Sequence, residues 1–286
     1  MSRQYKRSYE LTITSPDGTS KIITDLRINF EITKSILSFP NLCRLTIYNP
    51  NSETISLLSR KFSKISLNAG YEGNMRLLFK GEVRNVFRAR QQPDSTVTVY
   101  AGDGEKDWQN STINKTFSES VSVKSAIDEV LKTFKNTSIG VIEGLPSSSD
   151  KLRGQTLSGS SKDVLDEFAK EYGFNWSIQD GEINIVPEES VLESDDAVVI
   201  SSATGMMGSP TITEIGADVT CLLNPRLLPN KAFKIESVNA DTQIGNLYFR
   251  EVKRTTAEGT YKIQESLFRG DSFEGDWLVS VKGISI

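Results

Sequence analysis

Alternation of apolar and polar residues at period two runs through most of the chain and limits the folds open to it. The segment 26–32 carries Leu26, Ile28, Phe30 and Ile32 at every second position. Side chains two positions apart on a strand point to the same face, so this pattern predicts strands with one buried face. Similar runs fill residues 9–103 and return after about residue 197. The sequence therefore predicts a mainly β protein with antiparallel sheets.

The first β region opens with a predicted hairpin. Residues 10–14 form one arm, Pro16-Asp17-Gly18 the turn, and residues 21–34 the second arm. Apolar residues at helical spacing predict one short helix within 52–62, with Ser52 as its N-cap. Further alternating runs supply more strands. Five or more antiparallel strands with one helix predict a small barrel or sandwich.

The segment from about residue 117 to residue 187 changes to helical periodicity. Apolar residues recur at spacings of three and four in 121–135, with Ser122 as the expected N-cap. A second helix is expected to begin at Ser160 or Ser161 and to stop at Gly173. Residues 144–154 between the helices have the composition of a loop. This segment is predicted to be a small α/β insert.

A hairpin should close the insert. Asp180-Gly181 stands between two alternating runs, which is the strongest hairpin signal in the chain. The apolar residues Phe174, Trp176 and Ile178 lie at period two in the first arm. We expect them to cover the helices as core residues, and not to serve as a base-stacking platform.

A short internal echo links the two β regions. An apolar strand ends in Asn49-Pro50 in the first region, and another ends in Asn224-Pro225 in the second. With the similar strand counts, this echo favours a duplicated barrel. The predicted domains are residues 1–110 (first barrel), 111–190 (insert of two helices and a hairpin) and 191–286 (second barrel).

The chain contains no histidine, which removes the usual general base and a common zinc ligand. Ser-His-Asp and Cys-His catalysis are therefore excluded. Acidic residues remain as candidates for a carboxylate-held metal: Asp103, Glu105 and Asp107 alternate, and Asp195 adjoins Asp196. Neither group is specific, and the alternating acids lack the offsets of a Ca²⁺ loop and are expected to form a solvated turn. We predict no catalytic, cofactor or metal site.

Other features favour an ordinary structural protein. The Gly-Ser run at 158–161 lacks the lysine of a phosphate loop and is expected to cap a helix. Cys43 and Cys221 lie in apolar runs and should be buried thiols. A net charge of −4 argues against a protein that grips nucleic acid. With neither a signal peptide nor a membrane-spanning run, the protein is expected to stay in the compartment that makes it.

Motifs in both β regions resemble baseplate hub proteins of contractile phage tails and related injection machines. In the second region the matching residues are 208–210, Gly216, Val219, 222–225, Leu227, Pro229, Phe233, Ile235 and Ser237, then 261–263, Gly270-Asp271, Gly275 and Trp277. In the first region they are 28–32, 45–49, 69–71 and 79–83. The family carries histidine and glycine where this chain has Phe268 and Asn230. The resemblance touches nearly the whole chain.

The resemblance implies a structural hub subunit with two tail-tube-like barrels, and not an enzyme. It implies a homotrimer forming a pseudo-six-fold ring that joins the tail tube protein to the central spike protein. The tape measure protein and baseplate wedge proteins are further implied partners, with genomic DNA as passing cargo. The implied location is the tail baseplate of the virion, assembled in the host cytoplasm.

Two alternatives remain open. A tail-tip peptidoglycan hydrolase would need two carboxylates across a cleft, and Glu167 and Glu171 lie four apart on one predicted helix. Such acids are more simply the solvated face of that helix. A tail tube or tube-terminator subunit shares the barrel but needs one copy of it. For the hub, contacts between subunits are expected along the strands 76–88 and 246–254.

Overall fold

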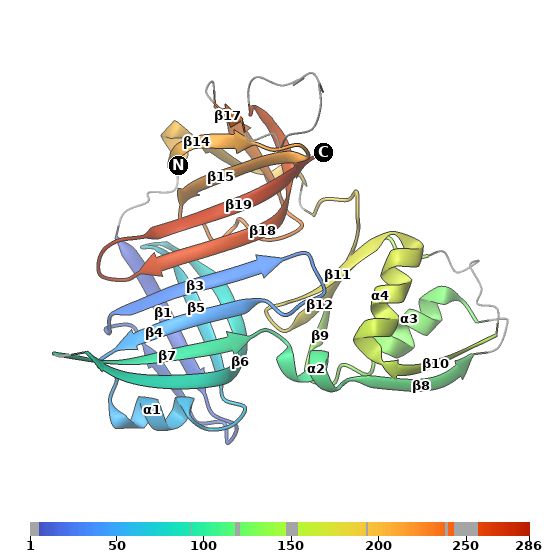
Figure 1. The fold of residues 1–286 in the computed structure, drawn as a ribbon, viewed down its shortest axis with the longest axis horizontal. Helices are drawn as coiled ribbons and strands as arrows, with labels where there is room; N and C mark the ends of the chain where they lie inside the picture. Colours follow the sequence, from blue (N-terminus) through green and yellow to red (C-terminus); the bar gives the residue numbers. More distant parts are fainter. Residues whose placement is uncertain are drawn as a thin grey trace. The chain divides into compact units, whose positions relative to one another are not determined.

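The computed structural model describes residues 6–91, 93–117, 121–146, 154–192, 194–237, 240–242 and 257–286 (Figure 1). Internal contacts divide the chain into two units. The first, here the sheet unit, comprises Met1–Ser35, Leu42–Ala101 and Val191–Ile286. The second, here the insert unit, comprises Ile36–Asn41 and Gly102–Ser190. The prediction of a mainly β protein with antiparallel sheets is confirmed.

The sheet unit contains most of the strands and one α-helix. Its first part consists of β1 (Arg7–Thr14), β2 (Ser20–Ile23), β3 (Ile28–Ser35), β4 (Leu42–Tyr48), α1 (Ser52–Leu58), β5 (Lys64–Tyr71), β6 (Asn74–Gln91) and β7 (Asp94–Gly102). Its second part consists of η1 (Ser194–Asp196), β13 (Val198–Ser201), η2 (Ser202–Thr204), β14 (Met206–Ile212), β15 (Gly216–Leu222), β16 (Ala232–Glu236), β17 (Asp241–Thr242), β18 (Gly259–Asp271) and β19 (Trp277–Ser285).

The insert unit combines two small sheets with three helices. Its elements are α2 (Glu105–Asn110), β8 (Thr112–Phe117), α3 (Val123–Leu131), β9 (Ser138–Ile142), β10 (Gln155–Ser160), α4 (Ser161–Tyr172), β11 (Phe174–Gln179) and β12 (Glu182–Pro187). One sheet has the order β11-β12-β9, and β8 pairs with β10 in the other. The predicted domain boundaries at residues 110 and 190 stay predictions.

Two local predictions in the first β region are wrong. The hairpin exists, since β1 pairs with β2, but its second arm ends at Ile23 instead of continuing to residue 34. The chain turns at exposed Thr24 and Asp25, and β3 pairs with β4 and β18 instead. The N-cap of α1 is Asn51, whose Oδ1 accepts a hydrogen bond from Thr54 N at 2.9 Å.

The sheet unit repeats one strand order. Its first six-strand repeat, the N-terminal repeat, has the order β3-β4-β7-β6-β5-β1. The second, the C-terminal repeat, has the order β14-β15-β19-β18-β16-β13. When the strands of each repeat are numbered by their order along the chain, both repeats place the same numbered strands side by side in the sheet. One pairing differs, because β1 runs antiparallel to β5 and β13 runs parallel to β16. The matching order supports a duplicated ancestor for both β regions.

The Asn-Pro echo lies at equivalent places in the two repeats. Asn49-Pro50 follows β4, and Asn224-Pro225 comes shortly after β15, the strand in the same position of its repeat. Asn49 adopts a positive φ of 52°, and its Nδ2 donates to Asp94 Oδ1 at 2.9 Å. A turn residue tolerant of left-handed backbone thus ends β4 beside its neighbour β7.

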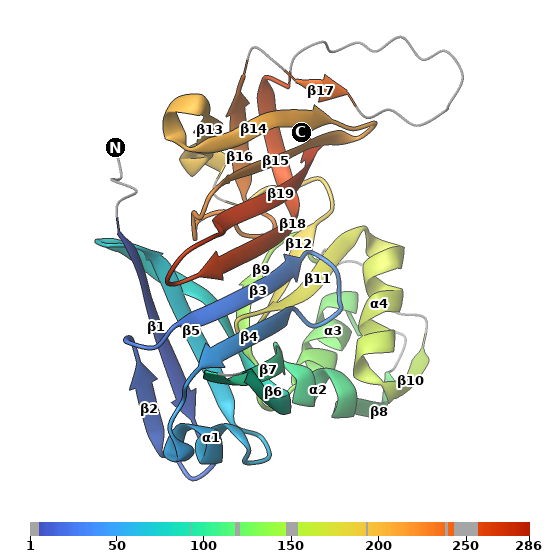
Figure 2. The ribbon, with the colours of Figure 1, turned by 60° about the vertical axis from the view of Figure 1, so that its left-hand side comes forward.

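The two repeats join through one antiparallel pairing. Strand β18 of the C-terminal repeat pairs with β3 of the N-terminal repeat over Glu265–Asp271 and Asn29–Ser35. Figures 1 and 2 both draw these strands side by side. One sheet path therefore connects β17 to β2. Among the described strands no pairing joins β1 to β3 or β13 to β14, so neither repeat is shown to be a closed barrel.

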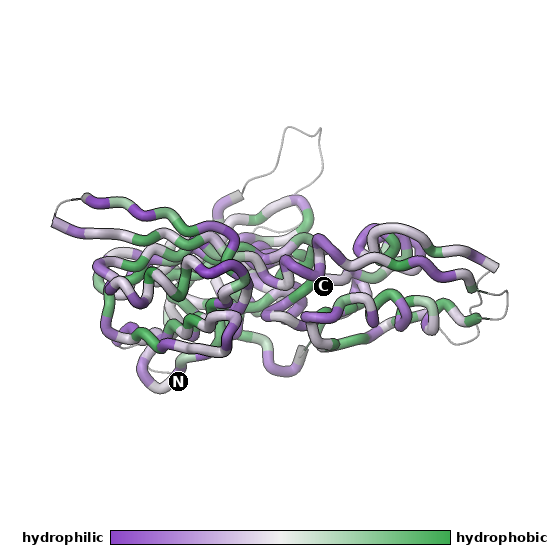
Figure 3. The backbone as a smooth tube through the Cα atoms, turned by 90° about the horizontal axis from the view of Figure 1, so that it is seen from below, coloured by the Kyte–Doolittle hydropathy of each residue, from purple (hydrophilic) through white to green (hydrophobic). Residues whose placement is uncertain are grey.

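Alternation places the core of the sheet unit on one face of its strands. Strand β3 buries Ile28, Phe30 and Ile32 while its intervening residues Asn29 and Glu31 stay exposed. Figure 3 shows hydrophobic and hydrophilic residues interleaved along the backbone. The buried residues of both repeats form one hydrophobic cluster. Cys43 and Cys221 belong to it as free thiols, as predicted.

The helices and hairpin predicted for the insert are confirmed. Ser122 caps α3, with its hydroxyl accepting from Ser125 N at 3.2 Å, and α4 ends at Gly173 with a φ of 71°. Strands β11 and β12 flank Asp180-Gly181, both with positive φ. The predicted aromatic residues are buried, and Trp176 Nε1 donates to Asp166 Oδ1 at 2.7 Å. The predicted loop 144–154 lies partly outside the described residues.

Close packing explains several residues of the hub-like motifs. At Gly270, a Cβ atom would lie 2.3 Å from Cζ of Phe30 and 2.8 Å from Cε3 of Trp277. These two aromatic rings meet edge to face, with centroids 5.4 Å apart. Asn230 has a φ of 66°, a conformation that asparagine tolerates better than most residues. Phe268 is fully buried.

Candidate interaction surfaces

Two of the three acids singled out between residues 103 and 107, Asp103 and Asp107, hold the insert unit together, whereas Glu105 accepts a hydrogen bond from Gln109 within the same helix. Asp103 is fully buried, and its carboxylate accepts the backbone N–H groups of Asp180 and Gly181, the latter at 2.8 Å. Asn41 Nδ2 donates to Ile178 O at 2.9 Å beside them. The carboxylate therefore fixes the β11–β12 turn. The expectation of a solvated turn is wrong here, because the partners lie far along the chain.

Asp107 has the same kind of role. It is 4% exposed, and its carboxylate accepts both the backbone N–H and the side-chain amide of Asn136. It also accepts from Thr137 N at 2.8 Å and from Thr137 Oγ1 at 3.1 Å. The sequence predicted no helix here, yet Asp107 lies in α2. Its donors are N–H and O–H groups, which occupy the oxygens that a cation would need.

The remaining acidic candidates do not form a site. Asp196 forms an ion pair with Arg226, and Asp195 lies beside it in η1. Glu167 and Glu171 are both on the exposed face of α4. Within the described residues, no group of three or more acids, cysteines or histidines is arranged to hold a metal ion.

The Gly-Ser run is structural, but only in part as predicted. Ser160 occupies the N-cap position of α4 without a side-chain capping bond. Ser161 is fully buried, and its hydroxyl oxygen accepts a hydrogen bond from Thr133 Oγ1 at 2.8 Å. Ser161 N donates to Ser111 O at 3.0 Å. The run thus ties α4 to the segments around β8 and α3.

The long strand β6 is a candidate surface for contacts between subunits. Strand β7 lies on one side of β6, and β5 pairs with its other side up to Glu82. Beyond Glu82, β7 is the neighbour of β6 among the described strands. Figure 1 draws the far ends of β6 and β7 extending beyond β4. Phe87 is 58% exposed there and packs edge to face on Tyr100, with ring centroids 5.8 Å apart. The other predicted strand, 246–254, lies outside the described residues.

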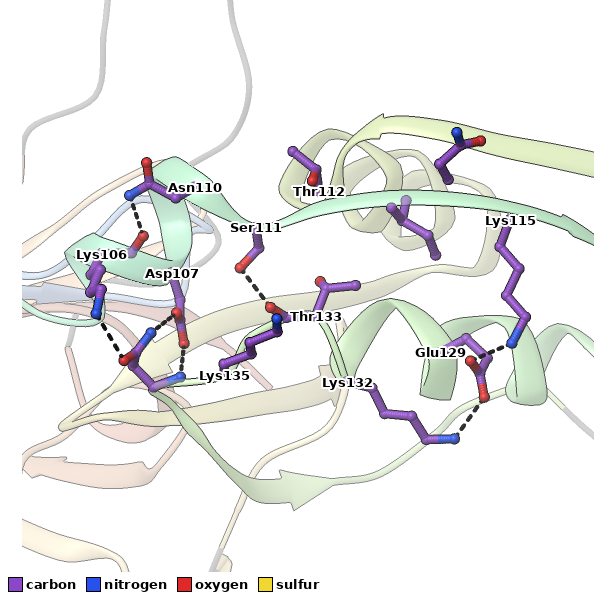
Figure 4. Close-up of a pocket in the computed structure, with 13 residues that line it drawn as sticks. Lys106, Asp107, Asn110, Ser111, Thr112, Lys115, Glu129, Lys132, Thr133 and Lys135 are labelled. Atoms are coloured by element: carbon purple, nitrogen blue, oxygen red, sulfur yellow. Dashed lines mark hydrogen bonds and ion pairs between the residues drawn. The ribbon is translucent and has the colours of Figure 1, made fainter.

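A lysine-lined pocket is a second candidate surface, which the sequence did not indicate. It lies in the insert unit, with a volume of about 490 Å³, between β8 and the segment from α3 to Asn136 (Figure 4). Glu129 bridges Lys115 and Lys132 at 2.5 and 2.6 Å. The hydrogen bonds from these two ammonium groups hold the pKa of Glu129 at about 2. The lysines are too scattered in sequence to form a recognisable motif.

Solved structures share the fold of this chain. The 43 kDa tail protein of prophage MuSo2 from Shewanella oneidensis matches with a TM-score of 0.65 at 12% identity, covering 97% of this chain and 98% of that one. A tail protein from Neisseria meningitidis MC58 matches with a TM-score of 0.61 at 8% identity, covering 97% and 96%. At these identities the likeness shows the fold alone.

A third structure comes from a secretion machine. The E. coli c3393 protein matches with a TM-score of 0.62 at 10% identity, covering 91% of this chain and 73% of that one. It is described as a type VI secretion component with structural similarity to the T4 bacteriophage tail proteins gp27 and gp5. Among curated protein sequences, none is significantly similar to this chain. No helix in the described part of the chain has the length and apolar character needed to cross a bilayer.

A family model decides the assignment that the motifs suggested. The model of the family described as Baseplate hub gp41 matches residues 9–249, most of the 286-residue chain. The match runs through the N-terminal repeat and the insert and into the C-terminal repeat. The chain belongs to the Baseplate hub gp41 family, and is a structural protein of a phage tail baseplate.

Proposed function

We propose that three copies of this chain form a closed ring at the baseplate, in which the two repeats of each copy act as tail-tube-like barrel units. Three copies then present six similar units to a six-fold tail tube. The repeated strand order supports this reading, because it supplies two equivalent units in one chain. A head-to-tail contact that closes by rotation gives a finite ring.

The pairing of β18 with β3 is the observation that carries the proposal. It joins one repeat to the next within the chain, so a ring of similar units would use the same contact between copies. The strand equivalent to β18 is β6. Two equivalent backbone hydrogen bonds align these strands. Val83 N in β6 donates to Ser63 O, just before β5, at 2.8 Å. Ile263 N in β18 donates to Lys231 O, just before the equivalent strand β16, at 2.9 Å.

Beyond that point the two strands differ in their partners. Strand β18 continues into Glu265–Asp271, which pairs with β3. The equivalent stretch of β6 is 85–91. Within the described residues it has β7 on one side and no strand on the other. An open edge of this length invites a strand from another chain, and its charged residues Arg88 and Arg90 would restrain non-specific pairing.

The strand equivalent to β3 is β14, which offers the complementary edge. It pairs with β15 on one side, and on the other side the described residues pair with it at Thr211 and Ile212 alone, through β17. The core-facing pair Phe30 and Leu45 matches the core-facing pair Met206 and Cys221. The next residue, Met207, opposite Thr220, is therefore the equivalent of Glu31, opposite Arg44. Met207 is 49% exposed. We infer that β6 of one copy pairs with β14 of the next.

The equivalence also gives a register for this contact. Within the chain Arg269 lies opposite Glu31. The residue equivalent to Arg269 is Ala89, so Ala89 would lie opposite Met207 of the partner subunit. Directly opposed residues of antiparallel strands have Cα atoms about 4.5–5.5 Å apart.

In the assembled baseplate, the ring would join the tail tube protein to the central spike protein and leave an axial passage for DNA. The tape measure protein and the baseplate wedge proteins would be further neighbours. The net charge of −4 suits a wall past which DNA slides, because it supplies little attraction for phosphates. The role is structural and not enzymatic, and the ring would form in the host cytoplasm before incorporation into the virion.

The mass of the purified full chain tests the proposal. Multi-angle light scattering should give the mass of a trimer, and negative-stain images should show rings of three-fold symmetry. A chain that stays monomeric at high concentration, and forms no ring when its tail tube and spike partners are added, would contradict the proposed assembly.

A further inference from the structure

The strand β8 of the insert unit has one open edge. Among the strands that the structure describes, its one partner is β10, with Thr112 opposite Ser160 and Phe117 opposite Gln155. Ser161 N donates to Ser111 O, so hydrogen bonds to the β10 side come from alternate residues starting at Ser111. The backbone N–H and C=O groups of Thr112, Asn114 and Thr116 therefore point to the other side. Within the described residues no protein group bonds to them.

The lysine-lined pocket lies along this edge. Five consecutive residues, 111–115, line it from β8 and its start. Its volume of about 490 Å³ is within the range of binding sites for drug-sized ligands. Unlike a compact anion site, it is bounded along its length by a strand whose outward backbone groups have no partner among the described residues. Its form therefore suits an extended chain.

The pocket is positively charged in a chain that is negative overall. Lysines at positions 106, 115, 132 and 135 line it, against the acids Asp107 and Glu129, which leaves an excess of two positive charges. Figure 4 shows Lys106 near one end, the Lys115–Glu129–Lys132 group near the other, and Lys135 between them. Lys106 donates to the uncharged amide oxygen of Asn136 at 3.3 Å. The carboxylate of Asp107 already accepts hydrogen bonds from Asn136 N and Thr137 N.

We propose that β8 accepts an extended, acidic segment of a partner protein as an added strand. Main-chain hydrogen bonds to Asn114 and its alternate neighbours would align the segment, and the lysines would pair with its carboxylates. Glu129 competes with that segment for Lys115 and Lys132. Charge complementarity at both ends of the pocket selects an acidic segment over a neutral one.

Fluorescence anisotropy with the full chain tests the proposal. The probe is a labelled peptide of about ten residues that alternates glutamate with threonine, and the control peptide carries glutamine in place of glutamate. The acidic peptide should bind, and the glutamine peptide should bind at least about tenfold more weakly. A chain that binds neither peptide, or binds both equally, overturns the proposal.

Paired lysine variants separate this pocket from general charge. The variant Lys106→Gln/Lys135→Gln should weaken binding of the acidic peptide at least about fivefold. The matched control Lys124→Gln/Lys170→Gln removes the same charge from exposed positions of α3 and α4 outside the pocket and should leave binding unchanged. Equal losses in both variants would mean that the peptide binds the surface without selecting this pocket, which rejects the proposal.

Two single substitutions test the mechanism in opposite directions. Glu129→Gln should strengthen binding, because it frees Lys115 and Lys132 from their present partner. Asn114→Pro removes an outward N–H at an open edge, a place where proline is tolerated, and should abolish binding while thermal unfolding stays cooperative. If Asn114→Pro retains binding, and inorganic phosphate displaces the peptide, the pocket is a small-anion site and the added strand is refuted.

Discussion

The guanidinium of Arg27 donates to the carboxylate of Asp271, with Nη2 2.8 Å from Oδ2, across 244 residues of sequence. Arg27 precedes β3 and Asp271 ends β18, so the pair lies where the two repeats meet. Asp271 also accepts Phe273 N at 2.9 Å. The carboxylate therefore fastens both the junction of the repeats and the turn after β18.

Loss of this carboxylate should destabilise the sheet unit. Asp271→Asn removes a charged acceptor from a side chain that is 9% exposed. Because Arg27 is itself 35% exposed, solvent screens the pair, and we expect a loss of about 1–2 kcal/mol at pH 7. Urea unfolding of the full chain measures it. The matched control is Asp276→Asn, at an exposed position five residues on, which should change the unfolding free energy little.

The effect of Asp271→Asn should depend on pH with a definite sign. Burial opposes ionisation of Asp271, but the hydrogen bonds from Arg27 and from two backbone N–H groups outweigh it and lower the pKa. A depressed pKa means that the folded state gains stability above the unfolded pKa of about 3.9, and loses it as pH falls through the folded value. Wild type and variant should therefore converge in stability in acid. A constant difference down to the lowest pH would contradict this account.

The absence of a side chain at Gly270 should be essential to the junction. Gly270→Ala would place its Cβ against the rings of Phe30 and Trp277. Overpacking of this kind costs about 1–3 kcal/mol. The double variant Gly270→Ala/Phe30→Leu should recover part of that loss, because it makes room for the methyl group. Differential scanning calorimetry would show it, and an equal or larger loss in the double variant would mean that the Phe30 ring is not the obstacle.

Removing the buried carboxylate of Asp103 should loosen the β11–β12 turn. In Asp103→Asn, the amide nitrogen cannot accept a hydrogen bond, so one backbone N–H of Asp180 or Gly181 loses its acceptor. We expect a cost of about 1–3 kcal/mol. Hydrogen exchange at these two amides should accelerate, whereas the exposed control Glu167→Gln should leave it unchanged.

The same carboxylates should not respond to metal ions. Donor groups already fill the oxygens of Asp103 and Asp107, so millimolar Ca²⁺ or Mg²⁺ should leave the melting temperature of the wild-type chain unchanged. An upward shift that Asp103→Asn or Asp107→Asn abolishes would show instead that these acids bind a cation.

Zymography on peptidoglycan tests the remaining enzymatic alternative. Glu167 and Glu171 lie four residues apart on the exposed face of the single helix α4, whereas a hydrolase needs two carboxylates facing each other across a cleft. We therefore expect no lysis band from the full chain. A band that is present in wild type and lost in Glu171→Gln would revive the hydrolase reading.

Local signals in the sequence predicted the insert better than the sheet unit. Helices α3 and α4 and the Asp180-Gly181 turn follow from patterns a few residues long, which packing left intact. Strands β8 and β10 were missed, because they are short and mostly polar, and their exposed residues break the alternation. Composition does not reveal such strands.

Long-range partners explain the other failures. The sequence predicted that Asp103 lies in a solvated turn. Its carboxylate instead accepts a hydrogen bond from Gly181 N, which lies 78 residues away, so no local pattern could indicate the contact. The Asn-Pro echo indicated two related β regions, but the shared strand order depends on pairings such as β18 with β3, which no local pattern specifies. The lysine pocket likewise gathers residues from α2, β8 and the end of α3.

Disulfide cross-linking across the proposed β6–β14 contact tests the ring most directly. In Ala89→Cys/Met207→Cys, the new cysteines of neighbouring copies would be directly opposed, within the Cα separation of about 4.4–6.8 Å that a disulfide needs. Oxidation should give covalent dimers and trimers and nothing larger, because the ring closes. The control Arg88→Cys/Met207→Cys shifts one cysteine by one residue, to the opposite face of β6, and should not cross-link. Monomers alone from Ala89→Cys/Met207→Cys, or a ladder beyond trimer, would contradict the proposed ring.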